Sequence, residues 1–403
     1  LLSPGGSIFA IFDQDLGTVG ENLVHAFALD AEWSFGITGA LGLSSLGDWT
    51  LRAADILGGG VGTIFDWTLE FFGAQSVIDD VYHYTAGFLE YAGVQSARQT
   101  LVDANGGSDW VQMAGVQDDI AAVLAGNVSV DGNFWFSTDG TVENLITGDG
   151  DDALTGTPNA NILQAGRGND TLVGGAGDDT LSGGQGSDQL FGNGGFDVAD
   201  YGGSGVGLRV DLAVWSANTG QAAGDVYQGV DGLAGSGFDD DLRGNKLVNQ
   251  LSGGAGDDFL NGRGGNDVLI GGLGDDTLRG GPGRDALSGG GGRDVADYSY
   301  IASGLTVDLI LNHWNTGDAT GDTFSGIDGI LGSTHNDILR GGYSANTLVG
   351  NGGDDFLEGR EGDDWLRGGH GNDTLRGGRG ADTLDGGAGF DVVDYGQARE
   401  GVT

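Results

Sequence analysis

Apolar residues recur at intervals of nine positions through the larger, C-terminal part of the chain, and each is flanked by polar residues. In the first stretch they are Leu154, Leu163, Leu172, Leu181 and Leu190. A single apolar residue between polar neighbours is the pattern of a short strand that turns one side chain into a core and the others to water. The spacing therefore predicts a succession of short strands joined by tight turns.

Each strand belongs to a nine-residue unit that reads Gly-Gly-x-Gly-x-Asp-x-Leu-x, as in residues 174–182. Glycine is needed where the backbone adopts positive φ or lies too close to a neighbour for a Cβ, and a turn of alternating glycines presents carbonyl oxygens inward. Calcium takes about six to eight oxygen ligands from carboxylates and carbonyls. One aspartate and about two or three turn carbonyls from each of two stacked turns complete such a shell, so the unit predicts a calcium-binding scaffold.

Units of this kind run without interruption through residues 147–200, 235–297 and 332–394. The chain thereby resembles the repeat-in-toxin (RTX), or hemolysin-type, family of calcium-binding proteins, whose nonapeptides form a parallel β-roll. The resemblance implies that two units make one turn of the roll, and that calcium lies between turns stacked on the same side, bridged by the sixth-position aspartates. It also implies type I secretion and folding outside the cell.

The sixth position carries the metal ligands that the resemblance implies. The seventeen aspartates at this position are Asp152, Asp170, Asp179, Asp188, Asp197, Asp240, Asp258, Asp267, Asp276, Asp285, Asp294, Asp337, Asp355, Asp364, Asp373, Asp382 and Asp391. Three units have Asn161, Asn249 or Asn346 instead, each in the second unit of its block, and we expect these sites to be weak or empty. An acidic segment rich in glycine would by itself be interpreted as disordered. The regular recurrence of leucine at the eighth position of the unit favours a folded roll instead.

A longer period lies over the short one, because the Asp-Tyr pairs at residues 200–201, 297–298 and 394–395 are spaced 97 residues apart. The connectors between the blocks also align, and their Val-Asp-Leu alternation predicts a strand that continues or caps the roll. Trp215 and Trp314 lie in short insertions of these connectors, where packing against the roll is favoured over a platform for carbohydrate.

This period defines the predicted domains. They are an N-terminal region (1–137), a first module with one roll (138–201), a second module with connector and roll (202–298), a third module with connector and roll (299–395) and the start of a further connector (396–403). The incomplete last connector leads us to expect that the chain is a piece of a longer protein.

Charge supports the same interpretation. The chain has 59 acidic residues against 16 Lys and Arg, a formal net charge of −43, and no cysteine. Such a charge opposes compaction unless cations neutralise it, and on the order of a dozen calcium ions would supply roughly +24. We therefore expect folding and calcium binding to be one event and the fold to rely on calcium rather than on disulfides. The acidic surface argues against nucleic acid or an anionic membrane as a partner.

The N-terminal region has a different composition. Apolar residues at helical spacing predict a helical hairpin over residues 45–72, a helix over 76–91 and a third helix around 118–124. The predicted fold class is mainly β, with tandem calcium-bound parallel β-rolls preceded by a small, mostly α-helical region that serves assembly or attachment. Charged residues interrupt the most apolar part of this region, so no transmembrane segment is expected.

Motifs of catalysis are missing from the sequence. The five histidines never form His-Glu-x-x-His, Gly-x-Ser-x-Gly does not occur, and no cysteine nucleophile exists. We nominate no catalytic residue and expect that the chain is not an enzyme.

The favoured function is a secreted, calcium-dependent structural or adhesive scaffold of the cell surface or extracellular matrix, which self-associates or binds other cell-surface proteins. One alternative makes the rolls a folding and secretion module of a protease, lipase, or polysaccharide epimerase or lyase whose catalytic domain lies outside these residues. Another makes them a polysaccharide-binding array that uses Trp215, Trp314 and Tyr343.

Overall fold

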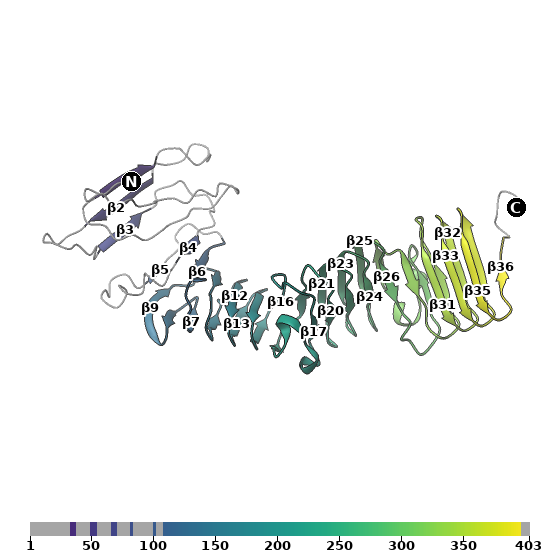
Figure 1. Ribbon diagram of the computed structural model, residues 1–403, viewed down its shortest axis with the longest axis horizontal. Helices are drawn as coiled ribbons and strands as arrows, with labels where there is room; N and C mark the ends of the chain where they lie inside the picture. Colours follow the sequence, from purple (N-terminus) through teal and green to yellow (C-terminus); the bar gives the residue numbers. More distant parts are fainter. Residues whose placement is uncertain are drawn as a thin grey trace. The chain divides into compact units, whose positions relative to one another are not determined.

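The computed structural model describes residues 108–395, without the side chains of residues 133–137, and the backbone of residues 33–37, 49–54, 66–70, 81–83 and 100–101. The chain divides into two compact units, Leu1–Arg167 and Gly168–Thr403. Nearly all regular structure in the described residues is β (Figure 1).

The first unit contains three sets of strands. An antiparallel sheet is formed by β1 (Trp33–Ile37), β2 (Trp49–Ala54) and β3 (Asp66–Glu70). A parallel set has the order β4 (Val81–His83), β6 (Trp110–Gln112), β10 (Asn144–Ile146) and β12 (Ile162–Arg167). A mixed set has the order β5 (Thr100–Leu101), β9 (Asn133–Thr138), β8 (Asn127–Val130), β7 (Ile120–Val123) and β11 (Ala153–Thr155).

The helices predicted for the N-terminal region are wrong wherever the structure describes them. The segment predicted as a helix around residues 118–124 contains β7, whose side chains alternate between buried and exposed. Strands β2 and β3 lie within the predicted hairpin over residues 45–72, and β4 lies within the helix predicted over 76–91. Short apolar runs fit both periods, and β-branched and aromatic residues such as Thr50 and Trp67 favour strands. The rest of these segments lies outside the described residues.

The strands of the second unit pair in parallel. One of its sheets has the order β13 (Thr171–Ala176), β15 (Gln189–Gly194), β18 (Val226–Gln228). A second has the order β14 (Thr180–Gln185), β16 (Val198–Asp200), β19 (Gly232–Ala234), β21 (Gln250–Ala255), β23 (Val268–Leu273), β25 (Ala286–Gly291), β28 (Thr323–Ser325). A third has the order β17 (Arg209–Asp211), β20 (Asp241–Arg243), β22 (Phe259–Asn261), β24 (Thr277–Arg279), β26 (Val295–Asp297), β29 (Gly329–Leu331), β31 (Thr347–Gly352), β33 (Trp365–His370), β35 (Thr383–Ala388). The fourth has the order β27 (Thr306–Asp308), β30 (Ile338–Arg340), β32 (Phe356–Glu361), β34 (Thr374–Arg379), β36 (Val392–Val393).

The core of this parallel β-solenoid is a stack of eighth-position residues. In-register pairing places Leu242 beside Leu260 and Leu260 beside Leu278, and all three are 0% exposed. Burying each leucine contributes about 1.5–3 kcal/mol relative to leaving it in water. The predicted strands, with one core residue each, are thus confirmed, and the pairing of each strand with its counterpart one turn away brings the sixth-position residues into line.

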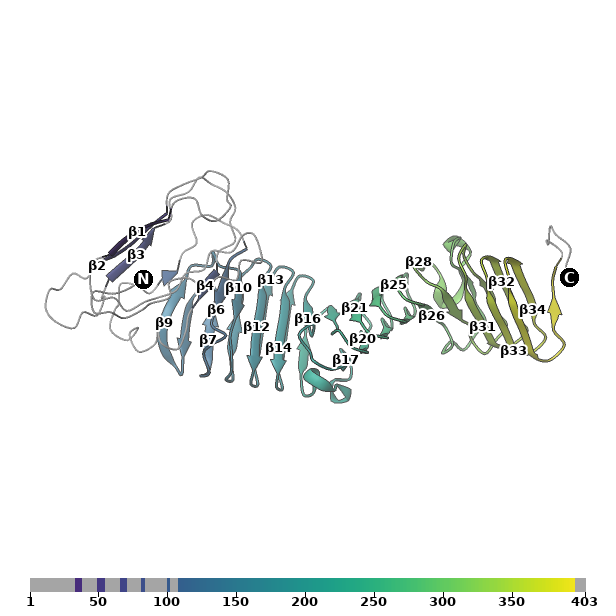
Figure 2. The same ribbon diagram turned by 45° about the horizontal axis from the view of Figure 1, so that its top comes forward.

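Each connector interrupts one sheet and leaves another continuous. In the first connector, β18 ends one sheet and β17 begins a new one, while β19 pairs with both β16 and β21. The chain between β17 and β18 forms two short 3-10 helices, η1 (Trp215–Ala217) and η2 (Gly220–Ala222), which are drawn beside β17 in Figure 2. The second connector repeats this arrangement with β28, β27 and β29 and with η3 (Asn312–Trp314) and η4 (Gly317–Ala319). The stack of apolar core residues therefore continues from one module into the next, through Leu233 in the first connector and Ile330 in the second.

Candidate calcium centres

The sixth-position aspartates form ladders along the stacked turns. In the second module the backbone N–H of Asp240 donates to Oδ1 of Asp258 at 2.8 Å, and that of Asp258 donates to Oδ1 of Asp276 at 2.9 Å. On the other side of the roll, the N–H of Asp267 donates to Oδ1 of Asp285 at 2.8 Å. Each bond joins residues 18 positions apart, so units on the same side alternate with units on the other.

The second carboxylate oxygen of these residues lies against the first glycine of its own unit. A Cβ on Gly253 would be 2.1 Å from Oδ2 of Asp258, and a Cβ on Gly271 would be 2.2 Å from Oδ2 of Asp276. The glycine is therefore required by the carboxylate, because any side chain at that position would collide with it.

Many of these Oδ2 atoms are buried and lack a hydrogen bond. Within the part of the chain that the structure describes, Oδ2 has no hydrogen-bond partner at nine sixth-position aspartates that are 0–3% exposed, namely Asp197, Asp258, Asp267, Asp276, Asp285, Asp294, Asp355, Asp364 and Asp373. A buried carboxylate oxygen without a partner is costly unless a cation binds it. These residues consequently fit a metal ion.

Backbone carbonyl oxygens point from one stacked turn toward the next. A Cβ on Gly274 would lie 2.1 Å from the carbonyl oxygen of Gly256, and a Cβ on Gly272 would lie 2.1 Å from that of Gly254. Among the described residues, no group of three or more His, Cys, Asp or Glu side chains is arranged so that it could hold a metal ion by itself. A metal ion between two stacked turns would therefore take a large share of its ligands from carbonyls, and this mixture of hard oxygen donors suits calcium.

Burial raises the pKa of these carboxyl groups. It raises the pKa of Asp258 to about 7, with the carboxylates of Asp276 and Asp240 adding to the effect, and that of Asp267 to about 7. For Asp276 and Asp285 the pKa rises to about 6, again chiefly through burial. The buried sites thus favour the neutral acid on their own, whereas a cation between the turns would favour the charged form.

The remaining ligand candidates are not equivalent to these. In the second module, Asp240 accepts hydrogen bonds from the backbone N–H of Ser236 at 2.5 Å and from its Oγ at 3.0 Å, and Asp337 in the third module is bound by Ser333 in the same way. Both aspartates belong to the first unit of their roll. Their carboxylates are already satisfied by hydrogen bonds within their own turns.

The other candidates fall into two groups by burial. In the first module, Asp152, Asp170, Asp179 and Asp188 are at most 2% exposed. The N–H of Asp170 donates to Oδ1 of Asp188 at 2.9 Å, which repeats the ladder of the second module. Asp382 and Asp391, in the last units, accept the N–H of Asp364 and Asp373 but are more exposed to solvent.

The sixth-position asparagines use both ends of their amides inside the fold. Oδ1 of Asn249 accepts the N–H of Asn245 at 2.7 Å, while its Nδ2 donates to the carbonyl of Asp231 at 3.0 Å. Asn346 and Asn161 make the equivalent pair of bonds. An amide is suited to this position because its partner is a carbonyl oxygen, which a carboxylate would repel. The expectation that these sites are weak or empty stays a prediction, and it now has a structural reason.

Two connector aspartates continue the ladders, although they do not belong to a nine-residue unit and were not predicted as ligands. The N–H of Asp188 donates to Oδ1 of Asp225 at 2.9 Å, and the other oxygen of Asp225 accepts the hydroxyl of Tyr201 at 2.7 Å. In the second connector Asp322 accepts the N–H of Asp285 at 2.9 Å and the hydroxyl of Tyr298 at 2.7 Å.

The connector aspartates lie 37 residues beyond their partners instead of 18, so the period hides them. Burial raises the pKa of Asp225 and of Asp322 to about 7. A signal was nevertheless present, because residues 224–227 and 321–324 both read Gly-Asp-x-aromatic, which matches the fifth to eighth positions of the unit.

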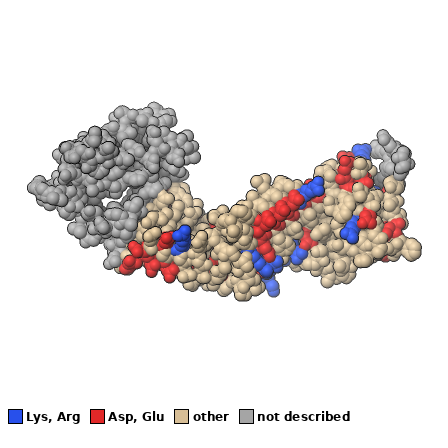
Figure 3. Space-filling view, in the orientation of Figure 1, with Lys and Arg blue, Asp and Glu red and all other residues tan. Residues whose placement is uncertain are grey.

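A second set of aspartates lies at the solvent face of the turns. The fifth-position residues Asp239, Asp257 and Asp275 are exposed, and the N–H of Asp257 and of Asp275 each donates to the carboxylate one turn earlier, at 2.9 and 2.8 Å. Figure 3 shows acidic side chains gathered in a band along the roll. These carboxylates carry surface charge and provide a natural control for the buried ones.

The family comparison agrees with this geometry. A family model described as "RTX calcium-binding nonapeptide repeat (4 copies)" matches residues 139–172, 146–181, 164–199, 234–269, 261–296, 331–366 and 358–393. These residues are RTX-type calcium-binding repeats. The repeats form a calcium-binding domain that is not itself catalytic, and RTX repeats are typical of secreted proteins.

No curated protein matches this RTX-type chain. Among its described residues, no helix has the length and apolar character needed to cross a membrane.

Proposed function

We propose that this RTX-type protein is a secreted structural or adhesive scaffold of the cell surface or extracellular matrix, exported by type I secretion and folded outside the cell by calcium. Its calcium ligands are sixth-position aspartates, together with carbonyls of the stacked turns. The observation that carries the calcium assignment is the row of buried Oδ2 atoms without hydrogen bonds, such as those of Asp258 and Asp276. The chemistry that calcium supplies there is charge neutralisation, which makes burial of these carboxylates favourable.

The scaffold role rests on continuity between modules. Strand β19 pairs with strands of the first and second modules, and β29 pairs with strands of the second and third. Shared sheets leave no hinge of unpaired chain on that face, so the second unit resists extension and bending as one body. Such a body suits a load-bearing or spacing role, with self-association or other cell-surface proteins as its partners.

The test of the calcium assignment is a calcium titration of the whole chain, followed by far-UV circular dichroism and calorimetry, with magnesium as the control. We expect β-structure to appear cooperatively with many calcium ions per chain and not with magnesium, which prefers smaller and stricter octahedral sites. A chain that is fully folded in chelator, or that stays unfolded in calcium, contradicts the assignment.

The scaffold role has its own test. Assembly of the whole chain in calcium, measured by light scattering, is compared with assembly after deletion of residues 1–137. Loss of assembly supports attachment through the N-terminal region, and unchanged assembly rejects it. A catalytic domain in the complete reading frame would instead favour the second proposal, in which the rolls are the folding and secretion module of an enzyme.

A further inference from the structure

Two arginines occupy a turn position that is glycine in most units. Arg263 and Arg360 are the second residues of their units and adopt φ of 74° and 81°. This left-handed region is unfavourable for residues with a Cβ, so the strain must be offset by something that the side chain does.

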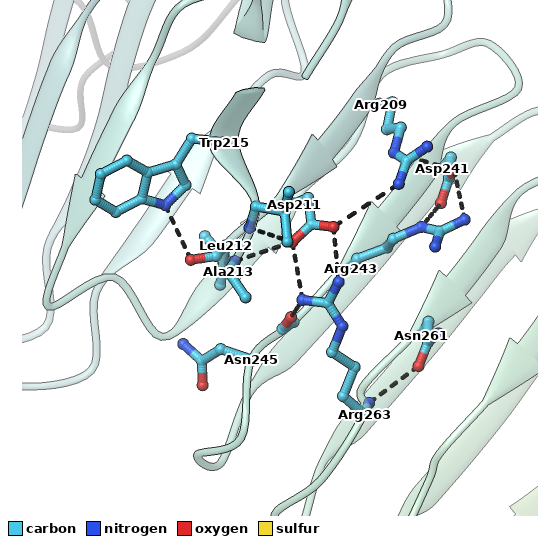
Figure 4. A network of polar contacts seen from close by, with 12 residues as sticks. Arg209, Asp211, Leu212, Ala213, Trp215, Asp241, Arg243, Asn245, Asn261 and Arg263 are labelled. Carbon is cyan, nitrogen blue, oxygen red and sulfur yellow. Dashed lines mark hydrogen bonds and ion pairs between the residues drawn. The ribbon is translucent and has the colours of Figure 1, made fainter. Parts of the chain in front are cut away.

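Three hydrogen bonds join the guanidinium of Arg263 to oxygen atoms. Its Nη1 and Nη2 donate to Oδ1 and Oδ2 of Asp211 at 2.8 and 2.7 Å, and Nη1 also donates to the carbonyl of Gly244 at 2.6 Å (Figure 4). The side chain of Asp211 is only 1% exposed. Arginine suits this role because its planar fork matches a carboxylate with two parallel bonds.

The third module repeats the arrangement. Arg360 donates to Oδ1 and Oδ2 of Asp308 at 2.9 and 2.6 Å and to the carbonyl of Gly341 at 2.8 Å. In the first module, the residue at the corresponding position is Gly175.

The guanidinium of Arg263 lies between two stacked units of the roll. Gly244 belongs to the unit whose sixth residue is Asn249, and Arg263 belongs to the unit stacked on it, whose sixth residue is Asp267. The stacking is direct, because the N–H of Asn249 donates to Oδ1 of Asp267 at 2.8 Å. The positive charge thus lies between two stacked turns at the level where asparagine has replaced aspartate.

The oxygen atoms around the guanidinium are of the kinds that calcium takes elsewhere in the roll, two from a carboxylate and one from a carbonyl. Burial raises the pKa of Asp211, but hydrogen bonds from Arg263 and from the N–H groups of Ala213 and Val214 outweigh it, and the pKa lies below its ordinary value. Asp211 therefore stays charged and paired without a metal ion, unlike the sixth-position aspartates.

We propose that Arg263 and Arg360 are built-in cations, which take the place of calcium between the second and fourth units of the rolls in the second and third modules. The inference rests on the proposed binding of calcium between the other stacked turns. Its consequence is that each connector, through Asp211 or Asp308 at the end of the first strand of a new sheet, is joined to its roll without calcium. Calcium binding would then order the remaining turns of each roll, next to the contact that the arginine has already formed.

The decisive experiment converts the arginine site into a calcium site. The double variant Arg263→Gly/Asn249→Asp restores glycine and aspartate, and calcium per chain is counted by equilibrium dialysis with metal analysis of the whole protein. We expect a gain of about one calcium ion over the unchanged protein. Arg293→Ala, which removes an exposed arginine of the same roll, is the matched control and should leave the count unchanged.

The outcomes separate the two proposals. No calcium bound by the unchanged protein defeats the proposed function itself. Many ions bound, but no gain in the double variant or in its third-module counterpart Arg360→Gly/Asn346→Asp, overturns the built-in cations alone.

Hydrogen exchange in chelator gives a readout that does not count ions. Strands β17 and β20 should be protected in the unchanged protein and lose that protection in Arg263→Gly, and equal protection in both overturns the inference.

Discussion

At the scale of the residue, the nine buried aspartates from Asp197 to Asp373 whose Oδ2 has no hydrogen bond use their two oxygens in different ways. Oδ1 accepts a backbone N–H from the turn before, which sets the spacing of the stack, and Oδ2 faces the first glycine of its own unit without a hydrogen bond. The fold therefore directs one oxygen of each carboxylate to the backbone and leaves the other for a cation, which would offset the cost of burying the charge.

Adjacent aspartates allow this division to be tested. Asp258→Asn removes the charge of a buried carboxylate, and Asp257→Asn removes the same charge from the exposed fifth position next to it. We expect Asp258→Asn to lower the number of calcium ions bound and the midpoint of thermal unfolding in calcium, because Asp258 borders the turns before and after it. Asp257→Asn should change neither appreciably, and equal effects in calorimetry would show that only the total charge matters.

The raised pKa values predict how stability depends on pH. The carboxyls of Asp258, Asp267 and Asp355 have a pKa of about 7 in the fold, against an ordinary value of 3.8, so between these values the folded state binds more protons than the unfolded state. The contribution of these carboxyls to stability in chelator should then be complete below the ordinary value and be lost as the pH rises through about 7. Calcium binds the deprotonated form, so its affinity should rise over the same interval.

The amount of β-structure that forms in chelator at pH 5 and at pH 8, measured by far-UV circular dichroism, checks the first half of this expectation, and proton release during calcium titration checks the second. Greater calcium-free stability at pH 8 would contradict the assignment of the buried carboxylates.

At the scale of the element, the first glycine of a unit should be the least replaceable. A Cβ on Gly271 would meet Oδ2 of Asp276 at 2.2 Å and the carbonyl of Gly289 at 2.7 Å, whereas a Cβ on Gly264 would meet nothing nearer than 3.7 Å. Gly271→Ala should therefore destabilise the folded protein in calcium by about 1–3 kcal/mol, as overpacking does. Gly264→Ala serves as the control, and chemical denaturation compares the two variants.

The surroundings of Asn218 in the first connector and of Asn315 in the second differ by one hydroxyl group. In the first, Nδ2 of Asn218 donates to the hydroxyl of Tyr227 at 3.3 Å. In the second, Phe324 stands at the corresponding position, and within the described residues the buried Nδ2 of Asn315 has no partner.

This difference makes a paired prediction. Phe324→Tyr should supply the missing acceptor and stabilise the protein by about 1 kcal/mol, while Tyr227→Phe should remove the existing one and destabilise it by about 1–2 kcal/mol. Denaturant midpoints at saturating calcium measure both changes. A loss of stability in Phe324→Tyr would mean that its hydroxyl does not reach Asn315.

At the scale of the whole molecule, charge decides whether the chain is compact. The net charge is −43, so the acidic residues repel one another and oppose a compact fold. The cations that offset this repulsion must bind inside the roll, because the buried carboxylate oxygens lie there. We therefore expect calcium to reduce the hydrodynamic radius of the whole chain markedly, while sodium chloride at equal ionic strength gives a much smaller change because screening does not satisfy buried oxygens. Dynamic light scattering measures this radius, and equal compaction by both salts would contradict calcium-driven folding.

Much of this molecule was decided locally and could therefore be predicted. The nine-residue period of glycine, aspartate and leucine specifies strand, turn and core at once, because each turn of the roll contacts only its neighbours. The solenoid, the leucine stack at Leu242, Leu260 and Leu278 and the burial of the sixth-position aspartates follow from that period.

Features that join distant parts of the chain were decided by the tertiary structure alone. The pairing of Arg263 with Asp211 spans 52 residues, and Asp225 joins the ladder only because an inserted loop returns its strand to the sheet. The conformation of β7 was also decided by the tertiary structure, because this short apolar run is a strand through its pairing with β8 and β11. The nine-residue period determines the strand, turn and core residue of each unit, because these form among neighbouring turns. Residues that depart from the period, such as Arg263 and Asp225, find their partners only when the fold brings distant segments together.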